Sequence, residues 1–140
     1  MILVDSSVWI EAARREGDLA TKVALRAVLD EYEAALCAPV KLEVMGGARR
    51  EERRALEAFF SCLPYQECRE SDWTAAKELA WKLRDAGHTL PWNDHLIAAI
   101  ARGRAVRVFA RDAHFETLET LGVIRLYRPG YGGRFAPDEG

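Results

Sequence analysis

The sequence predicts a three-layer α/β/α domain built around a mostly parallel central sheet. Short apolar runs alternate along the chain with longer segments of helical periodicity, and this pattern is typical of strands joined through helices that cover both faces of a sheet. Four carboxylates, Asp5, Glu43, Asp94 and Asp112, follow an apolar run or stand in the first turns of a predicted helix. Because the loops beyond the carboxyl ends of parallel strands face one crevice, we expect these four acids to meet in space.

Length and composition fit one globular domain. The chain has 140 residues, 49% of them hydrophobic and 30% charged, and its net charge of −2 provides no overall attraction to nucleic acid. We expect the domain to span residues 1–127, and residues 128–140, which are rich in Gly and Pro, to form a loose tail. No segment is apolar for long enough to act as a signal peptide or to span a membrane, so we expect a cytoplasmic protein. Cys37 and Cys62 lie within apolar runs and are expected to be reduced and buried.

The N-terminal half is expected to contain two strands and four helices. The apolar runs at residues 1–4 and 35–38 predict buried strands. Caps, helix breakers and apolar stripes predict the helices: one begins at Ser6 or Ser7 and ends before Gly17, one is capped by Asp18 and carries Leu25, Val28, Leu29 and Tyr32, one runs from Pro39 to Gly46, and one carries Leu56, Phe59, Phe60 and Leu63.

The C-terminal half is expected to contain three strands and three helices. The strands are a weakly indicated one at residues 64–68 and two clearer ones at 105–110 and 123–127. The same signals predict the helices: one is capped by Ser71 or Asp72, carries Ala76, Leu79, Ala80 and Leu83 and ends at Gly87, one runs from Pro91 through Leu96, Ile97 and Ile100 to Gly103, and one carries Phe115, Leu118 and Leu121 and ends at Gly122.

The four acids have a chemical and a structural interpretation. Clustered carboxylates repel one another unless a divalent cation neutralises them, and such hard oxygen ligands suit Mg²⁺ or Mn²⁺, whose usual substrate partner is a phosphate. Taken singly, Asp5 and Asp112 also stand where helix N-caps belong, and Asp94 where an acid complements the helix dipole. Glu43 lies in the apolar stretch 42–45, so we expect it to be a carboxylate in apolar surroundings that needs a partner.

Four blocks of the sequence carry a more specific signature. They are VDSSVWIE at residues 4–11, APVKLEVMGG at 38–47, LPWNDHLIAAIA at 90–101 and VFARDAHFE at 108–116. In order and spacing these blocks resemble the PIN domain, and among its members they most resemble VapC-type ribonuclease toxins of toxin–antitoxin pairs. The resemblance covers residues 1–127 and implies a PIN-like fold.

The resemblance implies a Mg²⁺- or Mn²⁺-dependent endoribonuclease that hydrolyses RNA phosphodiester bonds as a toxin. The family's acidic quartet falls on Asp5, Glu43, Asp94 and Asp112, which would hold one or two ions and orient the attacking water. The supporting polar residues in the same blocks are Ser6, Ser7 and Asn93.

Two protein partners also follow from the resemblance. A homodimer is expected, and Trp73, Trp81 and Phe60 add apolar surface beyond what one small core absorbs. A small antitoxin is expected to restrain the nuclease by laying an amphipathic helix on the first helices around Trp9 and Leu25, unless these two side chains are ordinary core residues.

Two positions depart from the family pattern. Ala110 stands where members often have Thr or Ser, and His114 where they often have a second Asp, and both changes are expected to weaken a second metal site. His114 has three interpretations, an exposed surface residue, a phosphate contact or an acid–base group, and the first is favoured for a histidine without evident partners.

Contacts with RNA are expected from four residues. Arg49 and Arg50 follow the Gly46-Gly47 break, Arg111 precedes Asp112, and Trp92 is placed to stack on an unpaired base. The structural alternative is that residues 49–54 form a solvated helix face of mixed charge and that Trp92 covers the core.

Other functions stay open beside the toxin. These are a free-standing RNA-processing PIN nuclease and a catalytically inactive PIN module that binds RNA or protein. A haloacid-dehalogenase-like phosphatase is disfavoured, because Ser7 stands where its second Asp is needed. A receiver domain is disfavoured because every lysine lies within a predicted helix.

Overall fold

The computed structural model describes residues 1–140 and contains a four-stranded sheet in which all strands run parallel. β1 lies in the middle, where Ile2 pairs with Ala34 on one side and with Arg107 on the other. All three residues of β1 are buried, because helices cover both faces of the sheet at its centre, and this explains the continuous apolar run. In sheet order, the strands are β3 (Tyr65–Gln66), β2 (Ala34–Cys37), β1 (Ile2–Val4) and β4 (Arg107–Phe109).

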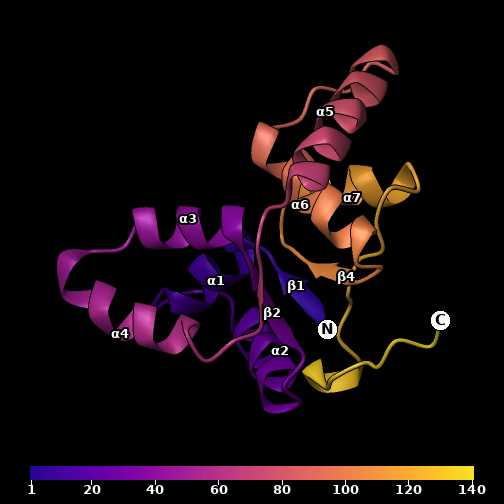
Figure 1. Ribbon diagram of the computed structural model, residues 1–140. Helices are drawn as coiled ribbons and strands as arrows, with labels where there is room; N and C mark the ends of the chain where they lie inside the picture. Colours follow the sequence, from indigo (N-terminus) through magenta and orange to yellow (C-terminus); the bar gives the residue numbers. More distant parts are fainter.

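Seven helices flank this sheet and confirm the predicted three-layer α/β/α class. Figure 1 shows α1, α3 and α4 grouped on one side of the strands and α5, α6 and α7 grouped on the other. None of the helices combines the length and the apolar character that crossing a bilayer requires. The helices are α1 (Ser6–Ala13), α2 (Leu19–Asp30), α3 (Ala38–Gly46), α4 (Arg50–Phe60), α5 (Glu70–Asp85), α6 (Trp92–Gly103) and α7 (Ala113–Thr120).

Tight strand-to-helix turns place polar side chains at one edge of the sheet. Asp5 stands between β1 and α1, and its carboxylate caps the helix by accepting a hydrogen bond from the Ser7 N–H. Asp112 caps α7 in the same way by accepting from the His114 N–H. The structural interpretation of both acids as N-caps is therefore confirmed, and the same turns aim both carboxylates beyond the strand ends.

A buried ion pair joins the C-terminal end of α6 to the first turn of α5. Arg104 follows the last residue of α6, and its guanidinium binds both carboxylate oxygens of the buried Asp72. Arg104 also donates to the Gln66 side chain and to the carbonyl of Glu67. The N-cap of α5 is Arg69 rather than Ser71 or Asp72, and Asp72 instead accepts from the Arg69 N–H at 2.8 Å. One arginine thus holds α5, α6 and the β3 region together.

The strand predicted at residues 123–127 is reduced to a single bridge between Leu126 and Val108. Val108 donates to the Arg125 carbonyl at 3.0 Å and accepts from the Tyr127 N–H at 2.8 Å. In a strand of three residues, only the middle one directs both of its backbone groups toward the free edge, so β4 cannot pair further. The prediction of a last strand was wrong for this reason.

Part of the segment 128–140, around residues 133–136, packs against the domain, whereas its other residues are exposed. The ring of Phe135 stacks on that of Tyr127 with centroids 6.1 Å apart, and the Tyr127 hydroxyl accepts from the Ala136 N–H at 3.2 Å. Gly133 has a φ of +82° and lies so close to α2 that an added Cβ would stand 2.7 Å from a side-chain carbon. The boundary of the domain at residue 127 stays a prediction.

Several side chains assigned to the core from the sequence are exposed, among them Phe59, which is 43% exposed within α4. Tyr32 is 92% exposed, because α2 ends at Asp30 and Tyr32 adopts a left-handed φ of 56°. Cys62 lies in the turn after α4 and is exposed, whereas Cys37 is buried as expected. Leu121 lies just past the end of α7 and is also exposed. For Tyr32 and Leu121 the periodic stripe extends beyond the point where the helix ends.

Candidate active site

The four predicted acids line one cleft beyond the carboxyl ends of the strands. Asp5 follows β1, Asp112 follows β4, Glu43 belongs to the helix after β2, and Asp94 lies in the first turn of α6. The cleft has a volume of about 310 Å³, and only one of its ten lining residues is apolar. The remaining polar residues of the lining are Ser6, Ser7, Glu11, Arg14 and Arg111.

Asp5 is the most buried of the four acids, with 4% of its surface exposed. Its Oδ2 accepts hydrogen bonds from the Ser7 N–H at 3.1 Å and from the Ser7 hydroxyl at 2.6 Å. Burial raises the pKa of Asp5, the hydrogen bonds from Ser7 oppose this rise, and the charge of Glu43 adds to it. The Ser7 hydroxyl also accepts from the Arg111 N–H at 3.0 Å, which links the end of β1 to the loop after β4.

Glu43 is exposed, contrary to the expectation of a carboxylate in apolar surroundings, and its neighbour Leu42 is exposed as well. Two polar residues hold its carboxylate from opposite oxygens: the Ser6 hydroxyl donates to Oε2 at 2.8 Å and the Asn93 amide to Oε1 at 3.0 Å. Each of the three residues expected to support the quartet, Ser7 included, therefore hydrogen-bonds to one of its acids.

Asp94 and Asp112 meet at His114, in the first turn of α7. The Nδ1 atom of His114 lies 3.0 Å from Asp94 Oδ2 and 3.0 Å from Asp112 Oδ1. Asp94 is 7% exposed, and burial, together with the charges of Asp112 and Asp5, raises its pKa to about 6. The favoured interpretation of His114 as an exposed surface residue was wrong, because its ring is partly buried between two acids.

This donor set fits a divalent cation. Single donor atoms of Asp94, Asp112 and His114 all lie within 4.8 Å of one another. Asp94 Oδ2 and His114 Nδ1 are buried, and neither has a partner at hydrogen-bonding geometry within the protein. Buried polar atoms without partners are costly, and a cation between them would satisfy both. The charge of Asp5 is near enough to raise the pKa of Asp94, so Asp5 belongs to the same cluster of acids.

The residues expected to contact RNA lie in different places. Arg111 lines the cleft, but its guanidinium already donates to the Thr21 hydroxyl at 2.6 Å. Arg49 caps α4 and lines a separate apolar groove, and Arg50, the first residue of α4, is exposed outside the cleft lining. Trp92 is 75% exposed at the start of α6.

Two cleft residues went unnoticed in the sequence. Glu11 and Arg14 line the cleft and form an ion pair with each other at 3.3 Å. They follow Ser7 by four and seven positions, which is the spacing of one helix face, so the position of Ser7 beside the acids was a sufficient signal.

Comparison with known proteins identifies the family. Residues 2–121 match the family model described as the PIN domain, so the chain belongs to the PIN-domain family. Its sequence is 36% identical over 126 residues to ribonuclease VapC11 of Mycobacterium tuberculosis, which covers 86% of this chain and 93% of that protein.

Solved structures share the fold. VapBC2 of Rickettsia felis, bound to a DNA fragment from its promoter, superposes with a TM-score of 0.73 at 19% identity, over 91% of this chain and 98% of that one. VapC20 of Mycobacterium tuberculosis, described as a sarcin–ricin loop cleaving toxin, superposes with a TM-score of 0.61 at 21% identity, over 84% of this chain and 94% of that one.

Proposed function

We propose that the protein is a divalent-metal-dependent endoribonuclease and the toxin of a type II toxin–antitoxin pair. The observation that carries this proposal is the convergence of Asp5, Glu43, Asp94 and Asp112 on one polar cleft that contains a buried carboxylate oxygen without a partner. Membership of the PIN-domain family and the ribonuclease names of its relatives support it. Transcripts are the proposed substrate, which places the activity in the cytoplasm.

The four acids have distinct proposed tasks. Asp94 and Asp112 would hold the Mg²⁺ or Mn²⁺ ion, with Asp5 behind them as a ligand or a source of negative charge. When bound, such an ion activates a water and stabilises the leaving oxygen of a phosphodiester. Glu43 is held by two hydrogen bonds at the exposed side of the cleft, where it can accept a proton from the attacking water.

The RNA would approach across the open side of the cleft. Arg14 and Arg111 are the two cations of its lining and are the proposed phosphate contacts. Trp92, next to Asn93, is the proposed stacking surface for an unpaired base. Arg49 and Arg50 stand at the start of α4, outside the cleft lining. They would reach only an RNA that extends beyond the cleft.

We propose that an antitoxin helix docks in an apolar groove between α1, α2 and α4. The groove has a volume of about 570 Å³, and eleven of its sixteen lining residues are apolar. Trp9 and Leu25 are buried core residues, as the alternative interpretation expected, and they also form part of the groove lining. Ile10 and Arg14 line the groove and the acidic cleft alike, so a peptide leaving the groove could insert a basic side chain among the acids.

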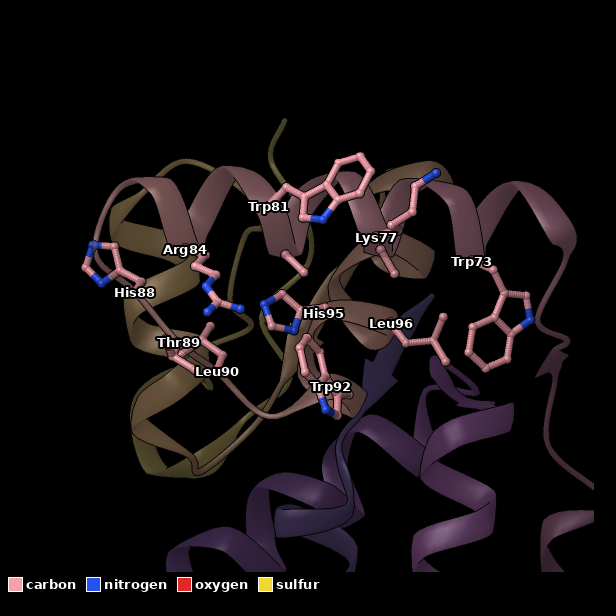
Figure 2. Close-up of a pocket in the computed structure, with 12 residues that line it drawn as sticks. Trp73, Lys77, Trp81, Arg84, His88, Thr89, Leu90, Trp92, His95 and Leu96 are labelled. Atoms are coloured by element: carbon pink, nitrogen blue, oxygen red, sulfur yellow. The ribbon is translucent and has the colours of Figure 1, made fainter.

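A homodimer is the second proposed assembly, and we place it on the indole face, defined as Trp73 and Trp81. These indoles are 55% and 60% exposed beside a cavity of about 340 Å³ between α5 and α6 (Figure 2). Exposed aromatic surface of this kind is typical of protein interfaces. Phe60, which the sequence also suggested for this role, is buried against Trp9 and cannot contribute.

Growth of cells that express the full chain tests the toxin. We expect growth arrest by the parent chain, none by Asp5→Asn, and unchanged arrest by Asp85→Asn, which alters an exposed acid at the end of α5. Co-expression of a small protein encoded beside this chain should restore growth. Absence of arrest, together with no copurifying partner, would instead favour a free-standing RNA-processing nuclease.

A further inference from the structure

His114 places an imidazole nitrogen beside two of the cleft's acids, Asp94 and Asp112. Its backbone N–H donates to Asp112 Oδ1 at 2.9 Å, which fixes the first turn of α7 and holds the ring toward Asp94. Nδ1 therefore lies 3.0 Å from a carboxylate oxygen of each acid, while neither contact has hydrogen-bond geometry. The ring nitrogen is buried even though the side chain as a whole is 42% exposed.

The spacing of these three atoms fits ligands of one cation, although a separation of 3.0 Å by itself also fits a hydrogen bond. An octahedral cation with bonds of about 2.1 Å separates adjacent ligand atoms by about 3.0 Å. The two separations from Nδ1 are both 3.0 Å, as between adjacent ligands of one ion, and all three donor atoms lie within 4.8 Å of one another. A hydrogen bond would instead require an N–H aimed at one oxygen, and that alignment is missing here.

We propose that His114 Nδ1 is a metal ligand and that, with it, the site selects Mn²⁺ over Mg²⁺. This inference rests on the proposed metal-dependent nuclease. Mg²⁺ prefers oxygen ligands, whereas transition ions accept an imidazole nitrogen. A neutral imidazole in place of a carboxylate also removes one negative charge from the site. This weakens the binding of a hard ion such as Mg²⁺, which is held mainly by charge. Asp94 and Asp112 supply the two oxygen ligands.

Pulsed electron paramagnetic resonance of Mn²⁺ bound to the full chain tests the ligand directly. We expect ¹⁴N modulation from a coordinated imidazole in the parent protein and its loss in His114→Asp and His114→Gln. The matched control is His88→Gln, which alters a histidine of the cavity between α5 and α6 and should keep the signal. Two replacements of different charge guard against a folding defect, which circular dichroism would reveal.

Calorimetric titration with each ion tests selectivity. We expect the parent to bind Mn²⁺ at least about tenfold more tightly than Mg²⁺, and His114→Asp to lose most of this preference. Mn²⁺ bound without ¹⁴N modulation, or a preference unchanged in His114→Asp, would overturn the inference and leave the nuclease proposal intact. Absence of Mn²⁺ binding together with absence of RNA cleavage would overturn both.

Discussion

The charge of Asp94 destabilises the metal-free fold. This side chain is buried and faces Asp112 and Asp5, and its pKa is raised to about 6 from an ordinary value of 3.8. A raised pKa means that the folded protein holds the proton more tightly than the unfolded chain. The folded state is therefore stabilised by protonation below about pH 4 and loses this contribution as pH rises through 6.

Asp94→Asn should consequently stabilise the metal-free protein. We expect a gain of about 1–2 kcal/mol in the free energy of unfolding at pH 7.5, because the amide carries no charge to bury, and almost no gain near pH 4. Urea denaturation in the presence of a chelator at both pH values measures this. Equal stability of variant and parent at pH 7.5 would show that the charge of Asp94 does not destabilise the folded protein.

Ser6 acts on catalysis through Glu43, so its proposed role is positioning. Ser6→Ala removes the hydrogen bond to Oε2 and should lower kcat about tenfold with KM nearly unchanged, since substrate contacts remain. The free energy of unfolding should change by about 1 kcal/mol or less. Ser6→Thr keeps a hydroxyl and should recover much of kcat. A large rise in KM, or no rescue by threonine, would contradict positioning.

Residue types and spacing indicated Asp5, Asp94 and Asp112, because each follows a strand or stands in the first turn of a helix, which is a local pattern. Glu43 lies within α3 and lacks such a local marker. The partner of Glu43 was less visible, since Asn93 is far away in sequence. The place of His114 between Asp94 and Asp112 depends on how α6 and α7 pack, which periodicity does not encode.

Among the elements, a strand that is followed by the polar N-cap of a helix could be predicted from the sequence. The pairing of one strand with another could not. Asp5 and Asp112 mark the ends of β1 and β4, so both the strand and the following helix could be placed from the sequence. Residues 123–127 carry the same β-branched and aromatic character, but their state depends on the number of free backbone groups in β4. Packing of the last residues on Tyr127 is likewise a tertiary effect that a Gly- and Pro-rich composition hides.

The ion pair between α5 and α6 gives a prediction at the same scale. Arg104→Met leaves a buried Asp72 without its main partner and should destabilise the fold by about 3 kcal/mol at pH 7. The hydrogen bonds from Arg104 lower the pKa of Asp72 below its ordinary 3.8, so this stabilisation exists above that pH and is lost as pH falls through the lower folded value.

Thermal unfolding at pH 7 and pH 3 measures both the contribution of the ion pair to stability and its dependence on pH. The difference between parent and Arg104→Met should be large at pH 7 and smaller at pH 3. Arg128→Met is the control, because its pairs with Glu116 and Glu119 lie at the surface and should contribute less than about 1 kcal/mol. Equal effects of the two substitutions would contradict a structural role for the buried pair.

For the whole molecule, three surfaces divide the proposed tasks: the acidic cleft for RNA, the apolar groove for an antitoxin, and the indole face for a second copy. Trp81→Glu should convert the dimer into a monomer at tens of micromolar protein, because a charge would be buried in an apolar interface. Tyr131→Glu, at a side chain that is 93% exposed outside this face, should leave the mass unchanged. Sedimentation velocity distinguishes the two states, and a parent protein that is monomeric at these concentrations would contradict the dimer.

Cleavage of a mixed RNA pool by the purified full chain tests the central claim most directly. We expect fragments to appear with Mn²⁺, to vanish with a chelator, and to fall at least about a hundredfold in Asp5→Asn and Asp112→Asn while Asp85→Asn keeps full activity. Cleavage that survives the chelator, or full activity in either cleft variant, would contradict a metal-dependent ribonuclease centred on these acids.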